Sequence, residues 1–170
     1  MRTQKATRNA MQIVLAATLL VSSTGFYAYT SPQSAPNIGI SGYLSGDKVP
    51  RGRAAQAVVV MDIPSGFHVH SNRPLERFLI ATNLQIDAPK GMKIGPVLYP
   101  RAVLRKLKFS RKKVAVYEGR ALMRFNLTVP ANFGSDSTEL KARLRYQSCN
   151  DELCFPPQTR EVKIPIRIKG

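Results

Sequence analysis

The amino-acid sequence predicts an all-β domain, an antiparallel β-sandwich of seven or eight short strands. Three runs near the C-terminus, residues 121–129, 140–147 and 162–169, alternate apolar and polar side chains. A period of two with one apolar face is typical of half-buried antiparallel strands. No segment favours a helix convincingly, and many short strands without helices indicate a sandwich. Pro165 lacks a backbone N–H, so its strand is expected at an edge or with that position facing outward.

Short strands bounded by turn residues are also expected in the first half of the domain. Residues 54–63 contain the apolar run Val58-Val59-Val60-Met61, which is typical of a buried strand. The turn chemistry of Pro64-Ser65-Gly66 ends this strand, and residues 67–70 start the next one.

The middle of the sequence is less regular. Residues 78–87 are a plausible strand that Pro89-Lys90-Gly91 ends, and residues 92–99 are another. Residues 100–113 break the pattern, because isolated apolar residues stand among basic ones. A short amphipathic helix is an alternative there, but we favour a long loop, and residues 114–117 resume extended structure.

The first 30 residues have the composition of a signal peptide or an N-terminal anchor. Arg2, Lys5 and Arg8 form a basic start, and residues 11–21 form an apolar run of the length expected for a signal-peptide core. The run is short for a membrane span. We therefore expect the domain to lie in the periplasm or elsewhere outside the cytoplasm. The expected organisation is a leader at residues 1–30, a linker at residues 31–39 and the domain at residues 40–170.

The chain is strongly basic, with a formal net charge of +16, of which the first 30 residues carry +3. Seven cationic residues form a basic stripe: Arg101, Arg105, Lys106, Lys108, Arg111, Lys112 and Lys113. Such a stripe could dock an acidic protein or an anionic membrane surface, or it could be a solvated loop. Nucleic acid is not an expected partner.

Cys149 and Cys154 are the two cysteines of the chain. Five residues of extended chain span roughly 17 Å, whereas the Cα atoms of a disulfide lie about 4.4 to 6.8 Å apart. The segment must therefore turn back if the sulfurs meet, and Asn150-Asp151 supplies turn chemistry. A ring this short contributes only on the order of 2 kcal/mol through loop closure. Such a ring is better suited to reversible reduction and oxidation than to stabilising the fold. A purely structural disulfide is the alternative.

The cysteine segment resembles the N-terminal domain family of the thiol:disulfide interchange protein DsbD. The resemblance rests on a tyrosine-glutamine pair, two nearby cysteines and a following proline pair, here Tyr146, Gln147, Cys149, Cys154, Pro156 and Pro157. Further stretches fit the family in order at residues 66–74, 97–100 and 116–119. The resemblance covers roughly residues 40–168. Some family members separate the cysteines by five residues rather than four, so the loop geometry is not transferred.

This resemblance implies an immunoglobulin-like sandwich with a redox cysteine loop at its rim. It implies that Cys149 and Cys154 form a redox disulfide that passes two electrons between a thioredoxin-like donor and client, without metal or organic cofactor. The chain would then be a thiol:disulfide oxidoreductase of the protein-disulfide reductase type. The family pattern favours Cys154 as the cysteine that attacks the client. Since the sequence contains no Cys-x-x-Cys and no long apolar segment, the electrons are expected to come from a separate polypeptide, for which a membrane electron transporter is a candidate, unless the relay of the family has been lost.

Several other residues are expected to support or shield the cysteines. The family covers its cysteines with a mobile loop bearing an aromatic residue, and Phe109 is the best candidate here, with a core position as the alternative. His68 and His70 are two apart on a predicted strand and therefore share a face. We expect them to line the redox site or to pack against Tyr146. With the cysteines and a methionine they could alternatively bind a soft metal such as copper.

A second class of function remains open. The chain could be a non-enzymatic sandwich that binds a protein through the basic stripe, with a disulfide that only fastens a loop. No Ser/His/Asp arrangement and no glycine-rich phosphate loop supports hydrolysis or nucleotide chemistry.

Overall fold

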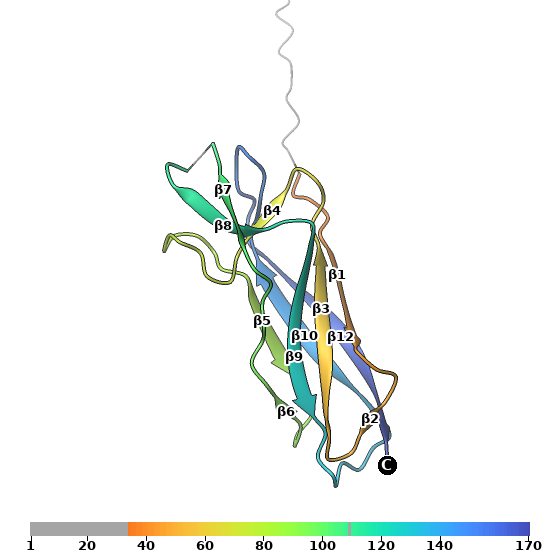
Figure 1. Cartoon of the computed structure of the whole chain (residues 1–170). Coiled ribbons are helices and arrows are strands. Elements are labelled where there is room, and N and C mark those ends of the chain that lie inside the picture. Colours follow the sequence, from red (N-terminus) through yellow and green to blue (C-terminus); the bar gives the residue numbers. More distant parts are fainter. Residues whose placement is uncertain (1–33, 109) are drawn as a thin grey trace, which may run out of the picture. The chain divides into compact units, whose positions relative to one another are not determined.

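The structure, a computed structural model, describes residues 34–108 and 110–170, which form an immunoglobulin-like β-sandwich (Figure 1). Within these ranges no helix is present that could cross a membrane. The strands are β1 (Gly39–Leu44), β2 (Val49–Pro50), β3 (Ala54–Asp62), β4 (His68–His70), β5 (Asn83–Asp87), β6 (Lys93–Ile94), β7 (Val103–Lys106), β8 (Lys113–Tyr117), β9 (Arg120–Thr128), β10 (Ser137–Tyr146), β11 (Ser148–Cys149) and β12 (Gln158–Lys169).

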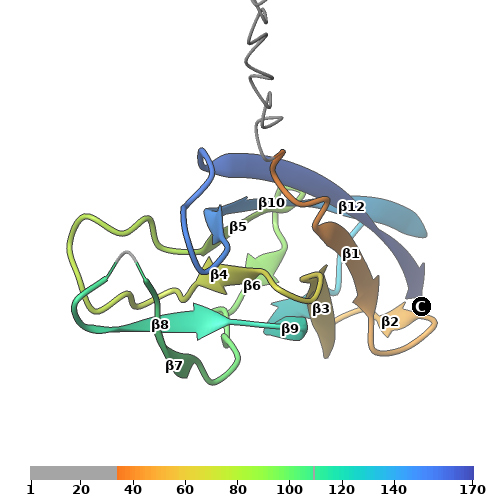
Figure 2. The same ribbon diagram turned by 90° about the horizontal axis from the view of Figure 1, so that it is seen from above.

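Two four-stranded sheets form the layers of the sandwich. One has the order β1-β3-β9-β6 and the other the order β2-β12-β10-β5 (Figure 2). Alternate residues of β9, β10 and β12 are buried between the layers, such as Phe125, Leu140 and Ile164. The period-two runs therefore predicted both the strands and their apolar faces correctly. Ile38, in the predicted linker, also lies in this core.

A third sheet, β11-β4-β8-β7, lies at one end of the sandwich, while β2 and β6 lie toward the other end (Figure 1). Its strands alternate between two cores. Val69 and Tyr117 face the main core, whereas Val114 and Val116 join Leu79 and Leu107 in a separate cluster, which we call the satellite core. The third sheet contains β11, which carries Cys149, and β4, which carries both histidines. Part of this sheet therefore packs on the satellite core.

The middle of the chain departs from the prediction. Residues 100–113 were expected to be a loop, but they contain β7. All four of its residues are exposed on a sheet edge, so β7 has no buried face that an apolar pattern could mark.

The strands expected at residues 78–87 and 92–99 are shorter in the structure than the sequence predicted, as β5 and β6 show. Phe78 is 74% exposed and precedes β5, and beyond β6 only a bridge from Leu98 to Arg124 continues the pairing.

Pro165 lies in the middle of β12, opposite Glu139 of β10. On its other side β12 pairs with β2 only at Ile168 and Lys169. The N–H of Ile168 donates to the carbonyl of Asp136 at 2.8 Å, so the alternation of an antiparallel ladder directs the nitrogen of Pro165 away from β10, as the sequence predicted.

Gly42 of β1 lies against β12 where the two layers meet. A Cβ atom added at Gly42 would be 2.7 Å from Cγ1 and 2.9 Å from Cδ1 of Ile164. We expect Gly42→Ala to lower the free energy of unfolding by about 1 to 3 kcal/mol, because overpacking a core shifts its neighbours. Urea denaturation measures the effect. Gly46→Ala is the control, since a Cβ there meets nothing within 4 Å; an equal loss in both variants would contradict this account of the contact.

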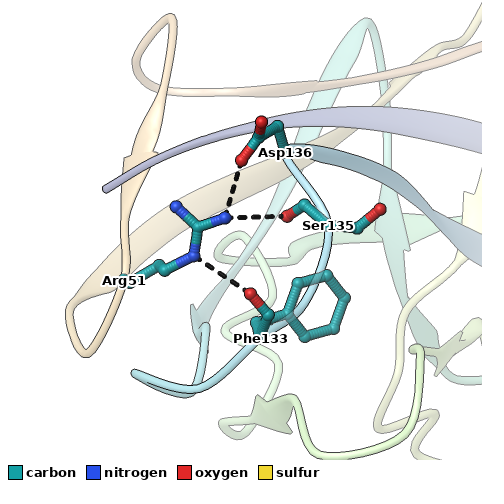
Figure 3. A network of polar contacts seen from close by, with 4 residues as sticks. All are labelled: Arg51, Phe133, Ser135 and Asp136. Atoms are coloured by element: carbon teal, nitrogen blue, oxygen red, sulfur yellow. Dashed lines mark hydrogen bonds and ion pairs between the residues drawn. The ribbon is translucent and has the colours of Figure 1, made fainter.

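A polar network fastens the end of the sandwich away from the third sheet (Figure 3). The Nε of Arg51, just after β2, donates to the carbonyl of Phe133 at 3.0 Å. Its guanidinium also donates to the Ser135 carbonyl at 3.4 Å and pairs with Asp136 at 2.7 Å. This side chain thereby joins the β9–β10 connection to the sheet that contains β2.

Candidate functional site

The cysteine loop leaves the sandwich directly after β10. Cys149 ends the two-residue strand β11, and a disulfide joins it to Cys154. Asn150 builds the turn between them, because its Oδ1 accepts hydrogen bonds from the backbone N–H groups of Glu152 at 2.9 Å and Leu153 at 2.8 Å. The predicted turn at Asn150 is therefore present, and the sulfurs meet at the rim of the domain.

The two cysteines differ in accessibility. Cys149 is 0% exposed, because β11 pairs with β4 and sets Cys149 opposite His68. Cys154 is half-buried and follows three exposed residues. A reacting partner can therefore approach Cys154 more readily than Cys149.

His70 lies against the disulfide. Its Nε2 is 3.4 Å from Sγ of Cys149 and 3.9 Å from Sγ of Cys154. The side chain is 0% exposed, and burial is the main cause that lowers its pKa. The Ile80 backbone lies near enough to favour a proton on the ring, although Nδ1 makes no well-formed hydrogen bond. The ring is thus a neutral imidazole near neutral pH, with one nitrogen facing both sulfurs.

His68 has a different environment on the same strand. It is buried and lines a groove of about 590 Å³ together with Glu118 and Asp151. Burial lowers the pKa of His68, and these two carboxylates oppose the effect. The histidines share a face of β4, as the strand period predicted, but the group of ligand atoms around the sulfurs contains His70 and not His68.

The hairpin formed by β7 and β8 reaches the cysteine loop. The backbone N–H of Lys108 donates to the carbonyl of Asp151 at 3.1 Å, and its Nζ pairs with Glu152 at 3.3 Å. Leu107 anchors this contact in the satellite core and is 3% exposed. The hairpin therefore contacts the cysteine loop directly, while Phe109, the predicted lid residue, lies outside the described residues.

Ion pairs neutralise part of the basic stripe. Arg105 makes two hydrogen bonds of 2.6 Å to the carboxylate of Glu118, and this contact lowers the pKa of Glu118. Lys108 pairs with Glu152, and Lys112 with Glu76 at 3.2 Å. The negative charge of Glu152 inside the cysteine ring is thus offset by a lysine of the hairpin.

The sequence comparison decides the family. The family described as Thiol:disulfide interchange protein DsbD, N-terminal, matches residues 44–166. The chain belongs to this family. No curated protein matches the chain. Membership of the DsbD N-terminal family, together with the Cys149–Cys154 disulfide, supports thiol–disulfide exchange as the general chemistry of the site, with thioredoxin-like proteins as partners in general.

Solved structures include two related domains. The DsbD N-terminal domain of Neisseria meningitidis in the reduced form is 18% identical, with 74% of this chain and 83% of that chain covered and a TM-score of 0.47. The N-terminal periplasmic domain of ScsB from Proteus mirabilis is 10% identical, with 74% and 44% covered and a TM-score of 0.48. Both scores are below 0.5, so the family assignment rests on the sequence match.

The residues that carried the DsbD resemblance hold the ends of the loop. Tyr146 is fully buried in the main core, and its hydroxyl donates to Oε1 of Gln158 at 2.9 Å. Gln147 donates from Nε2 to the carbonyl of Phe155 at 3.0 Å. The two prolines, Pro156 and Pro157, are exposed after this anchor.

Three contacts at the site were not found from the sequence. Leu107 and Lys108 were visible only as members of an irregular basic segment. The ring of Phe155 lies 6.0 Å from that of Phe67, centroid to centroid. The sequence did offer one indication of this aromatic contact, because Phe155 directly follows Cys154.

Proposed function

We propose that this chain is an extracytoplasmic thiol:disulfide oxidoreductase that passes two electrons from a thioredoxin-like donor to a thioredoxin-like client. The observation that carries the proposal is the pairing of a half-buried sulfur, Cys154, with a fully buried one, Cys149, at the domain rim. Such a pair provides one sulfur for attack from outside and one for resolution from inside.

The reaction begins with the reduced chain. The Cys154 thiolate attacks a sulfur of the client disulfide, a mixed disulfide forms, and one client sulfur leaves as a thiolate. Cys149 then loses its proton and attacks Cys154 Sγ, which releases the second client sulfur. The client gains two electrons and two protons, and the chain becomes a disulfide. A donor dithiol reverses these steps to reduce the chain again.

His70 is placed to take part in the resolving step. Cys149 is buried, and burial in apolar surroundings disfavours its thiolate. The Nε2 of His70, 3.4 Å away, is within reach of the thiol proton. We assign it the role of accepting this proton when Cys149 attacks.

The compartment and the source of the electrons are part of the same proposal. A leader in residues 1–30, which lie outside the described residues, would export the domain to the periplasm or an equivalent space. Reducing power would then come from a separate membrane transporter.

The β7–β8 hairpin is proposed to act as a lid over the cysteine loop. The ion pair of Lys108 with Glu152 is exposed and therefore weak, so the hairpin can separate from the loop.

The reduction potential of the full chain tests the proposal. The chain is equilibrated with glutathione or dithiothreitol buffers, and free thiols are counted. We expect a potential between about −120 and −270 mV, the range of known exchange proteins. A potential below about −300 mV would instead mark a structural disulfide and favour a binding module that uses the basic stripe.

A further inference from the structure

A group of three potential metal ligands surrounds the disulfide. The Nε2 of His70 and the Sγ atoms of Cys149 and Cys154 all lie within 4.8 Å of one another. They come from β4, from β11 and from the end of the cysteine loop. His70 and Cys149 are 0% exposed, so two of the three side chains are fixed by the fold before any ion arrives.

We propose that the reduced chain binds one thiophilic d¹⁰ metal ion, Zn²⁺ or Cu⁺, through both cysteine sulfurs and His70 Nε2. Thiolates are the ligands that select these soft ions, and imidazole suits both. This inference goes beyond electron transfer, and it differs from the copper option seen in the sequence because it assigns His70 and leaves out His68.

The distances around His70 already suit such an ion. Metal–sulfur bonds of about 2.3 Å and metal–nitrogen bonds of about 2.0 Å, at angles of about 110° to 120°, hold nitrogen and sulfur about 3.5 to 3.7 Å apart. The distances from Nε2 to the two sulfurs are 3.4 and 3.9 Å. The imidazole therefore needs little movement to become a ligand.

The sulfurs need a larger change, which reduction allows. The same bond lengths and angles place two coordinated sulfurs about 3.8 to 4.0 Å apart, farther than a disulfide permits. Cys149 is held in β11, so Cys154, which is half-buried at the loop end, is the residue that moves. Its exposed side also leaves an approach for the ion and room for a fourth ligand such as water.

Metal binding and disulfide formation exclude each other. The two thiols release two protons when the ion binds, and its charge and oxidation state do not change. Oxidation of the pair by a client disulfide transfers two electrons from the sulfurs to the client and sets the ion free. The oxidised chain keeps only His70 as a ligand, so the redox state of the chain would control the affinity.

Anaerobic titration of the full chain tests this proposal. The chain is reduced chemically, freed of reductant, and titrated with Zn²⁺ and separately with Cu⁺ against chromophoric chelators. We expect one ion per chain and an affinity at least about a hundredfold higher than in the oxidised chain, because two of the three ligands are lost on oxidation. This comparison of redox states needs no substitution. The two measured affinities also show which ion the reduced chain prefers. Equal affinity in the two redox states would overturn the proposal.

A matched pair of variants assigns the nitrogen ligand. His70→Asn should weaken binding about tenfold or more, whereas His68→Asn, on the same strand face, should leave it within about twofold. Thermal unfolding of the oxidised variants checks that each one folds. Equal losses in both variants would refute the role of His70. The titration uses no redox partner, so a chain that fails to exchange electrons can still bind the metal ion. Conversely, a chain that fails to bind the metal ion can still exchange electrons.

Discussion

In a Cys149→Ser variant, we expect a covalent complex with a thioredoxin-like partner to accumulate. Cys154 keeps its half-buried sulfur and can still attack, but this chain then has no second thiol of its own to resolve the mixed disulfide. Cys154→Ser should form no such complex, because the remaining sulfur of Cys149 is 0% exposed. Either variant should lose multiple-turnover exchange on the order of a thousandfold or more, as removal of a nucleophile does in other enzymes.

The measurement is non-reducing electrophoresis and mass spectrometry after reaction with a thioredoxin-like protein that keeps one active-site cysteine, supplied as a mixed disulfide with glutathione, so that glutathione leaves and no partner thiol can reverse the step. The double variant Cys149→Ser and Cys154→Ser serves as the control for noncovalent association. A complex trapped only by Cys154→Ser would reverse the order of attack. Salt-sensitive binding that is retained in the double variant, with no trapped complex in either single variant, would favour the binding module instead.

Leu107→Ala should raise the rate at which dithiothreitol reduces the disulfide under native conditions. Leu107 holds the β7–β8 hairpin in the satellite core, and the next residue bonds the cysteine loop. Truncating a buried leucine costs about 2 to 5 kcal/mol. In a small cluster near the surface we expect the low end, about 2 kcal/mol, which corresponds to roughly a thirtyfold larger open population of the hairpin.

Leu140→Ala is the matched control, since Leu140 is fully buried in the main core. This variant should lower the urea midpoint for unfolding of the whole domain but leave the native-state reduction rate close to that of the wild type. If the two variants accelerated reduction equally, the hairpin would not control access to the disulfide.

The strands and the cysteine turn could be predicted because each leaves a local pattern. β9, β10 and β12 bury alternate residues, and Asn150 bonds backbone groups two and three residues ahead. β7 leaves no such pattern, because all its residues are exposed.

The arrangement of the site depends on contacts between distant segments. The strand period placed His68 and His70 on one face, but the register that sets Cys149 opposite His68, and so brings His70 to the sulfurs, is a tertiary property. The alternating pattern predicted that Tyr146 lies on the buried face of its strand, and its ring belongs to the main core. The contact of Lys108 with Asp151 joins segments more than 40 residues apart, and neither segment indicates the other.

The position of Pro165 also affects how copies of this chain meet one another. An unpaired strand edge is a template for pairing with a second molecule, which leads to aggregation. Among the residues that the structure describes, β12 has no ladder on the side away from β10 along most of its length, and there Pro165 removes a donor that an added strand would need. At the edge of the third sheet, β7 carries Arg105 and Lys106, and charged side chains on an edge strand disfavour pairing with an identical strand. These two edges, among the several that the three sheets leave, therefore disfavour intermolecular strand addition.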